Sequence, residues 1–349
     1  MSKDRTPVIV SAARTAIGSF GGTLANIPAT ELGAVAIKGS VERAGIDPAS
    51  IDEVFMGSVV PAGLGQAPAR QAAIKAGIPV QVGAVTLNKV CGSGLKTAMM
   101  AAGLVKAGDG DIYVAGGMEN MNLAPYLLQQ GRSGYRLGHG TVLDACVHDG
   151  LWCPFEEQHM GLAAEWIARE YGVSREEQDQ FALESHQKAV AAQDKGYFEE
   201  EIVPVEVPQR KRDPILFDCD ESPRRDTSLE KLARLRPVFQ REGTVTAGNA
   251  SAITDGAAAV VVMSQARAGQ LGLKPIARIT GYAYGAVEPI EIFIAPAFAL
   301  RKLMQKTGKT LGDYDLFELN EAFAAQCLGD GKILADEGWD WDKVNVNGG

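Results

Sequence analysis

Short runs of β-branched residues alternate along this chain with alanine-rich segments of helical period, and this alternation constrains the fold most. It is typical of α/β proteins, in which helices cover a sheet and the buried strands read as continuous apolar runs. We therefore predict an α/β fold. The elements predicted in the first 120 residues are strands at 7–13, 54–60, 82–90 and 111–117, and helices at 30–44, at 67–76 and directly after Cys91.

Length and composition narrow the class of protein. A chain of 349 residues predicts two or three folding units, and its 46% hydrophobic content is enough for a large core. The net charge of −9 argues against nucleic-acid binding, which needs a basic face. No segment has the pattern of a signal peptide or a membrane span, and five scattered cysteines favour free thiols. We expect a cytoplasmic protein with no membrane partner.

The middle of the chain differs from both ends. Residues 122–247 carry most of the charge, with predicted helices at 159–171 and 175–195, and are expected to form an inserted loop domain. Residues 1–121 plus 248–275 would form a first α/β half. Residues 276–349 would form a second half, because a strand–helix–strand order recurs there as in a duplicated domain. The strands expected after the insertion are at 256–264, 277–285, 315–320 and 344–349. We expect that this second half is incomplete.

Cys91 is the residue with the clearest chemical potential. It follows a predicted strand and precedes a helix in the segment NKVCGSGLK. A thiol at a helix N-terminus is near unpaired N–H groups, which favour thiolate, and Gly92 and Gly94 would let a substrate carbonyl approach. A small buried residue at a tight turn is the alternative for any single cysteine.

The surrounding motifs separate these alternatives. NKVCGSGLKTAMMAA resembles the nucleophile segment of the thiolase family, and six further segments follow in thiolase order. These are GGMENMNLAPYLL, GYRLGHG, DGLW with EEQHMG, LRPVFQREGTVTAGNASAITDGAAA, NEAFAAQ and VNVNGG. The resemblance implies a duplicated α/β/α/β/α core with an inserted loop domain. It also implies acyl transfer on short-chain 3-ketoacyl-CoA such as acetoacetyl-CoA, in fatty acid metabolism.

The resemblance assigns roles to particular residues. Cys91 would carry the acyl group, and Asn320 would hold a water in an oxyanion hole, although helix N-capping is another role for this asparagine. The other positions matched to the family's contacts with coenzyme A and the acyl chain are Leu151, His159, Met160, Arg224, Phe239, Ala247, Ser251 and Phe323. His159 has a structural hydrogen-bonding role as its alternative, and Ser251 an ordinary turn role. The basic residues 210–212, with Arg224 and Arg225, would suit phosphates, or be a solvated surface.

Two features depart from the family pattern. The family places a His in a GHP motif after NVNGG and a second Cys in a CGGG-like loop, and the 349 residues contain neither. We therefore expect the chain as given to be inactive. The segment Ile292–Ala295 replaces a Met-Gly-x-Gly stretch of the family, which would reshape the rim of the acyl pocket.

Other classes of function remain open. A non-catalytic acyl-CoA-binding or scaffold subunit is the main alternative, and the related ketoacyl synthases lack the HMG and GNAS segments. The cysteines and histidines between 146 and 159 have no common zinc spacing, so no metal is expected. No covalently bound cofactor is expected, with coenzyme A and acyl-CoA acting as substrates. The resemblance implies a homodimer or homotetramer.

Overall fold

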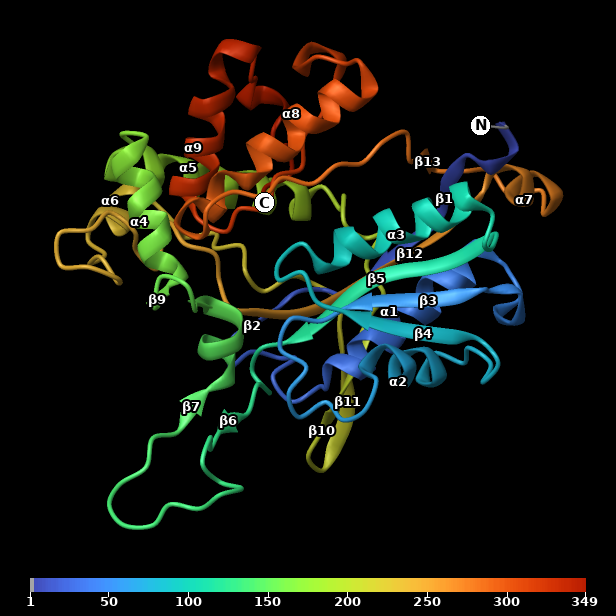
Figure 1. Ribbon diagram of the computed structural model, residues 1–349, viewed down its shortest axis with the longest axis horizontal. Coiled ribbons are helices and arrows are strands. Elements are labelled where there is room, and N and C mark those ends of the chain that lie inside the picture. The colour runs from blue at the N-terminus through green and yellow to red at the C-terminus, as the bar shows by residue number, and fades with distance from the viewer. Residues whose placement is uncertain (1–2) are drawn as a thin grey trace. The chain divides into compact units, whose positions relative to one another are not determined.

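The apolar runs of the first half form a seven-stranded mixed sheet in the structure, a computed structural model that describes residues 3–349 (Figure 1). Strands β3, β4 and β5 are parallel, whereas β12 is antiparallel to both of its neighbours, β1 and β5. The order along the sheet is β13 (Ala277–Arg278), β1 (Pro7–Arg14), β12 (Thr254–Ser264), β5 (Ile112–Asn120), β3 (Glu53–Gly57) and β4 (Gly83–Leu87), with β2 (Gly18–Ser19) beside β12. The predicted α/β class is confirmed.

Packing divides the chain into two units. Unit 1 comprises Met1–Gly150, Glu200–Ser222 and Ile253–Thr280, and unit 2 comprises Leu151–Glu199, Pro223–Ala252 and Gly281–Gly349. Each unit therefore takes part of the predicted insertion at 122–247. The predicted division into two halves and an inserted loop domain follows other boundaries and stays a prediction.

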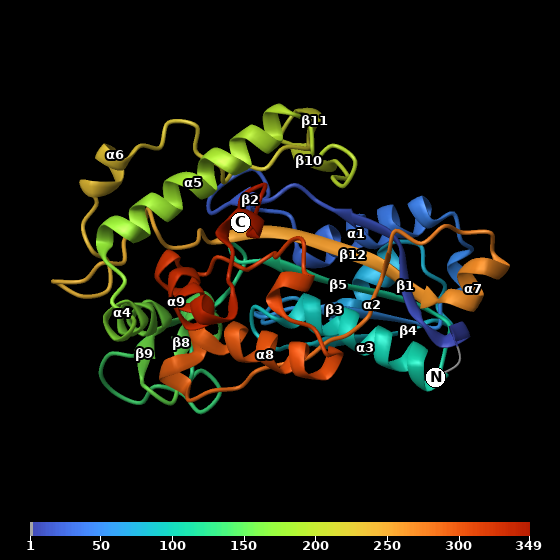
Figure 2. The ribbon, with the colours of Figure 1, turned by 90° about the horizontal axis from the view of Figure 1, so that it is seen from above.

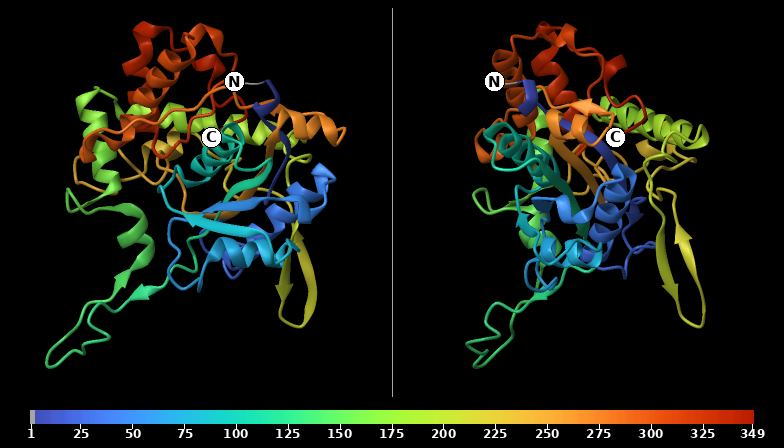
Figure 3. Two further views of the ribbon diagram at one scale, coloured as in Figure 1. Left: turned by 45° about the vertical axis from the view of Figure 1, so that its right-hand side comes forward. Right: turned by 90° about the vertical axis from the view of Figure 1, so that its right-hand side faces the viewer.

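Helices cover the sheet of unit 1 on both faces. The helices are α1 (Ala29–Ala44), α2 (Pro68–Lys75), α3 (Ser93–Ala107) and the short α7 (Gln265–Gln270). Side chains alternate along β5, so that Tyr113 and Ala115 join the core beside α3, while Met118 lies against Gly33 of α1. Two hairpins extend from this unit (Figure 3): β6 (Tyr126–Leu127) with β7 (Leu143–Asp144), and β10 (Val205–Gln209) with β11 (Arg212–Phe217).

Unit 2 is mainly helical. Its helices are α4 (Met160–Glu170), α5 (Arg175–Asp194), α6 (Leu229–Ala233), α8 (Ala295–Thr307) and α9 (Ala324–Leu334), and its one strand pair is β8 (Trp152–Cys153) with β9 (Gln158–His159). The long helix α5 begins with a capping box formed by Ser174 and Glu177, and α4 and α6 lie near its start (Figure 2). The helices predicted at 159–171 and 175–195 are thus confirmed to within one residue at each end.

Several predicted strands are shorter than expected. The strand predicted at 82–90 ends at Leu87, and that at 277–285 ends at Arg278. The strands predicted at 315–320 and 344–349 form one parallel bridge, between Phe317 and Val344. A strand needs a neighbour along its whole length, and no further strand pairs with these segments among residues 3–349. Within those residues, no helix has both the length and the apolar character to cross a membrane.

Candidate active site

Cys91 lies on a tight turn of unit 1 between β4 and α3. It is exposed and stands one residue before Gly92, the N-cap of α3. Its neighbour Val90 has a φ of 49°, which is strained for a β-branched residue. Such strain is concentrated at functional sites, where neighbouring structure holds it in place. The turn therefore presents the thiol to solvent at the start of a helix, and the alternative of a small buried residue is wrong.

Side-chain hydrogen bonds hold this strained turn. The Val90 N–H donates to Asn88 Oδ1 at 2.8 Å, and the Ser93 hydroxyl donates to the Val90 carbonyl at 2.6 Å. The Ser93 oxygen also accepts from the Lys89 N–H at 2.8 Å. Both peptide groups of Val90 are thus bonded, which keeps the residue in its left-handed conformation.

A further set of hydrogen bonds links the turn to Glu119 of β5. Asn88 Nδ2 donates to the Val59 carbonyl at 2.9 Å, and the Val59 N–H donates to Glu119 Oε2 at 2.5 Å. The other Glu119 oxygen accepts from the Val60 N–H at 3.3 Å. Burial raises the pKa of Glu119, an effect that these N–H donors oppose. A chain of hydrogen bonds through Val59 and Asn88 therefore links Glu119 to the turn that carries Cys91.

One glycine allows α3 to start close to the sheet. A Cβ added to Gly57 in β3 would lie 2.6 Å from Ser93 Cβ, closer than real Cβ atoms approach. At Gly92 and Gly94 an added Cβ would stay at least 3.5 Å from its neighbours. Packing thus requires glycine at 57 rather than at 92 or 94, whose predicted role toward a substrate stays a prediction.

The electrostatics of Cys91 differ from the expectation of a thiolate. Although the residue is exposed as a whole, desolvation by the surrounding protein raises the pKa of its thiol, and a hydrogen bond from its own backbone lowers it only in part. Desolvation disfavours the charged form of the thiol. The thiol is therefore protonated near neutral pH and needs a base to become a nucleophile.

In unit 2, aromatic rings gather around three of the predicted site residues. The His159 ring stacks on Phe239 with centroids 4.7 Å apart, and Phe239 meets Phe323 edge-on at 6.2 Å. Phe293, from the segment that departs from the family, lies edge-on to Phe323 at 5.1 Å. The altered segment thus contacts the residues predicted to line the acyl pocket.

His159 combines a structural and a potential chemical role. Its Nδ1 accepts the Gly161 N–H at 3.0 Å and so caps α4, which agrees with the structural alternative. Burial lowers the pKa of His159, so the ring is neutral near pH 7. Because Nδ1 is an acceptor, the proton is on Nε2, which can donate to a ligand.

The loop at 244–251 carries Ala247 and Ser251, and both residues are exposed. Its end binds the segment that contains Phe323: the Ser251 N–H donates to the Ala322 carbonyl at 3.1 Å, and the Ala324 N–H donates to the Asn249 carbonyl at 2.9 Å. Backbone hydrogen bonds thus connect the GNAS segment with the NEAF segment, and both segments contain predicted site residues.

Asn320 is exposed, and the N-cap of α9 is Phe323, so the alternative of Asn320 as the helix cap is wrong. The backbone beside Asn320 is held by Asn345, whose side chain bonds both the N–H and the carbonyl of Leu319 at 2.8 Å. Asn345 also donates to Glu321 Oε1 at 2.7 Å, while Ser185 of α5 donates to Glu321 Oε2 at 2.6 Å.

The remaining predicted contacts are less clustered. Leu151 and Met160 are half-buried in unit 2, and Arg224 is exposed. Arg225 pairs with Asp194 at 2.7 Å. Arg210 and Lys211 form the turn of the β10–β11 hairpin and Arg212 begins β11. All three belong to unit 1, so the basic run is divided between the two units. Across residues 3–349, no three acidic, His or Cys side chains gather as a metal site.

No local sequence pattern indicated the polar residues that hold these loops. Glu119, Glu165, Asp179 and Asn345 are far in sequence from the residues they bind, which leaves no local pattern to find. Asn249 lies within a recognised motif, but nothing in the motif indicates a partner on α5.

Comparisons with known proteins identify the family and the fold. Residues 7–266 match the family model described as Thiolase, N-terminal domain, and residues 273–349 match Thiolase, C-terminal domain. The acetyl-CoA acetyltransferase of Pseudomonas aeruginosa is 54% identical over 98% of this chain and 86% of that protein. That of Chromobacterium violaceum is 56% identical with the same coverage. The crystal structure of the Bacillus anthracis acetyl-CoA acetyltransferase matches with a TM-score of 0.95 at 42% identity, over 98% of this chain and 86% of that one. The chain belongs to the thiolase family.

Proposed function

We propose that this protein is a thiolase-type acetyl-CoA acetyltransferase, which forms or cleaves a short-chain 3-ketoacyl-CoA through an acyl group carried on Cys91. The exposed thiol on the strained turn before α3 carries the proposal, since a structural cysteine has no need of such a position. The name shared by the bacterial relatives supports the same activity and disfavours a non-catalytic binding or scaffold subunit.

The first step is acylation. After a base takes the proton of Cys91, Sγ attacks the thioester carbonyl, a bond forms between Sγ and the acyl carbon, and the bond to the coenzyme A sulfur breaks. The coenzyme A sulfur leaves with a proton. In the second step a base removes a proton from the α-carbon of another acetyl-CoA, and the resulting enolate carbon attacks the acyl carbon on Cys91. A carbon–carbon bond forms, the bond between the acyl carbon and Sγ breaks, and Sγ leaves as a thiolate that takes up a proton. Asn320 would hold a water that donates to the enolate oxygen.

Unit 2 provides the proposed substrate contacts. We assign the pantetheine arm to Ser251 and Ala247, the thioester to the Nε2–H of His159 and to Met160, and the apolar lining to Leu151, Phe239 and Phe323. Arg224 would contact the nucleotide end. Phe293 packs beside Phe323, which supports a preference for short acyl groups.

Assembly and location follow the same family proposal. A homodimer or homotetramer is supported by exposed apolar side chains on the 126–144 segment, among them Tyr126, Leu128, Leu137 and Val142. Five free cysteines support a cytoplasmic location.

A burst of free coenzyme A tests the proposal. With excess acetyl-CoA, we expect a rapid release of one coenzyme A per chain as Cys91 is acylated. Cys91→Ala should give no burst. A burst of equal size from the Cys91→Ala variant would refute the assignment of Cys91.

A further inference from the structure

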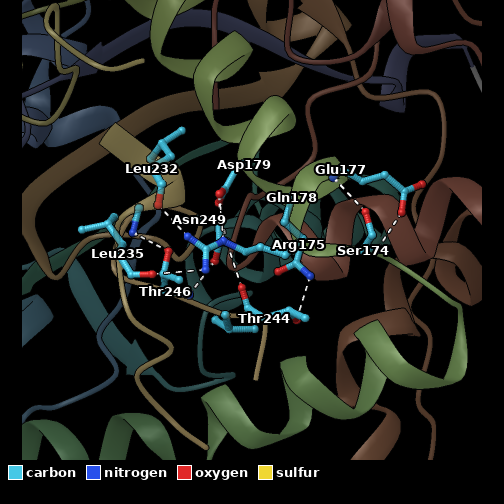
Figure 4. Close-up of polar contacts among 12 residues, drawn as sticks. Ser174, Arg175, Glu177, Gln178, Asp179, Leu232, Leu235, Thr244, Thr246 and Asn249 are labelled. Carbon is cyan, nitrogen blue, oxygen red and sulfur yellow. Dashed lines mark hydrogen bonds and ion pairs between the residues drawn. The ribbon is translucent and has the colours of Figure 1, made fainter. Parts of the chain in front are cut away.

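Asp179 and Asn249 are two buried polar residues of unit 2, exposed by 4% and 3%. Asn249 Nδ2 donates to Asp179 Oδ1 at 2.9 Å and to the Thr244 carbonyl at 3.1 Å (Figure 4). Its Oδ1 accepts the Thr246 N–H at 2.8 Å. One side chain thus closes the 244–251 loop on itself and ties it to α5.

Asp179 is bonded in turn to a cation one helical turn earlier. Arg175 Nε donates to Asp179 Oδ2 at 2.8 Å, and the two guanidinium ends donate to the carbonyls of Leu232 at 2.5 Å and Leu235 at 3.2 Å (Figure 4). A buried carboxylate is tolerated when it is paired and hydrogen-bonded in this way. Arg175, Asp179 and Asn249 therefore form a relay between the 232–235 segment and the loop.

The same segment supports the loop by packing. A Cβ added to Gly248 would lie 2.5 Å from a methyl carbon of Leu232 and 2.6 Å from one of Leu235. The loop backbone therefore rests directly on the two leucines whose carbonyls Arg175 holds. Arg175 therefore constrains the loop in two ways. It bonds to Asp179, which holds Asn249, and it holds the two leucines on which the loop packs.

The start of the loop has a separate anchor. Glu165 of α4, exposed by 4%, accepts the N–H groups of Thr244 and Val245 at 2.9 Å and the Thr244 hydroxyl at 3.0 Å. Gln178 donates to the same hydroxyl at 2.9 Å. Beyond Asn249 the loop binds residues 322–324. Asn249 is therefore the central support between two fixed ends.

We propose that the Arg175–Asp179–Asn249 relay is a positioning device that sets the 246–251 loop, and with it Ser251, for the pantetheine arm of coenzyme A. This inference rests on the proposed function. None of the three side chains would touch the substrate. They act through the loop backbone, whose exposed residues Ala247 and Ser251 would make the contacts.

Variants that exchange the two buried partners test the relay. Asn249→Asp places two carboxylates at hydrogen-bond distance, and Asp179→Asn removes the charge that orients the amide. The variant that carries both changes again has an amide opposite a carboxylate, but the amide of residue 179 now donates to the carboxylate of residue 249. Glu176→Gln, an exposed carboxylate in the first turn of α5, is the matched control.

Hydrogen exchange and coenzyme A binding are measured for each variant. In Asn249→Asp we expect faster exchange confined to residues 244–251 and 322–324, and coenzyme A binding weakened by about 10-fold, the effect of one or two lost buried hydrogen bonds. The double exchange restores the contact between positions 179 and 249 but not the donation to the Thr244 carbonyl, so it should recover part of the affinity. Glu176→Gln should match the unaltered protein.

Two results would overturn the relay: unchanged exchange in the loop of Asn249→Asp, or exchange raised evenly across unit 2. The second would mark a general structural role. If the unaltered protein neither binds coenzyme A nor releases it from acetyl-CoA, the proposed function fails, while the exchange pattern still decides for or against the relay.

Discussion

The turn at Cys91 and the loop at 244–251 are built in opposite ways. The turn is exposed, contains a strained Val90, and is held directly by the neutral side chains Asn88 and Ser93. The loop is held by buried charged groups, Glu165 and the Asp179–Arg175 pair. The contrast indicates that the exposed Cys91 turn depends on neutral side chains, whereas the 244–251 loop, which we propose binds substrate, depends on charged groups whose loss should destabilise the fold.

The strongest test of this contrast is removal of the thiol. Cys91→Ala should reduce release of coenzyme A from acetyl-CoA to background. Because the side chain is exposed, we expect the free energy of unfolding to change by no more than about 0.5 kcal/mol. Denaturant unfolding together with the burst assay measures both. A loss of several kcal/mol would show that the turn also supports the fold.

The converse test is in the loop. Glu165→Ala leaves three buried donors without an acceptor and should destabilise the protein by on the order of 3 kcal/mol. Glu165→Gln keeps one acceptor oxygen and should lose less. Urea unfolding of both variants measures the difference. Equal stability of Glu165→Ala and the unaltered protein would contradict the claim that the loop depends on buried charged groups.

The stability of the protein should also depend on pH through a buried carboxyl group of unit 2. Burial raises the pKa of Asp330 to about 7, while hydrogen bonds from Gln326 and the Ala297 N–H lower it in part. A carboxyl whose pKa is raised on folding is most favourable when protonated. Its contribution should therefore fall by about 1.4 kcal/mol per pH unit between its unfolded value and about pH 7.

Asp330→Asn should remove that dependence. We expect the variant to exceed the unaltered protein in stability at pH 8, with the difference shrinking toward pH 4. Thermal unfolding across this range measures it. A stability difference that is the same at every pH would contradict a raised pKa at Asp330.

The smallest expected effect concerns the support of the Cys91 turn. Glu119→Gln keeps an acceptor for only one of the two N–H groups at Val59 and Val60. We expect acylation of Cys91 to slow by about 10-fold, since a small misplacement of a reacting group is costly, with little change in coenzyme A affinity. Single-turnover release of coenzyme A measures the rate. An unchanged rate would show that Glu119 does not position the turn.

Local pattern was enough to predict much of the fold. The helices at 160–170 and 175–194 and the strand at 254–264 follow the periodicity of their own residues. The strand predicted to reach Val90 ends at Leu87 because the turn beyond it depends on Ser93 and on Val59, outside the strand itself. The strands expected near Phe317 and Val344 required a pairing partner that periodicity cannot supply.

The candidate site likewise contains residues that a local motif indicates and residues that no local motif indicates. Cys91 and Asn320 were found because short motifs surround them, and the structure leaves both side chains exposed. Their supports, Glu119 and Asn345, were not found, because each acts on residues that are distant in the chain. Desolvation raises the pKa of the Cys91 thiol and so opposes the expected thiolate, an effect that cannot be judged from the neighbouring letters of the sequence.

Peptide mass analysis after incubation with acetyl-CoA tests the central claim most directly. We expect one acetyl group on the peptide that contains Cys91, lost on addition of coenzyme A, with the peptides of Cys146, Cys153, Cys219 and Cys327 unmodified. Acetylation of another cysteine in place of Cys91, or a Cys91 peptide that stays unmodified, would contradict it.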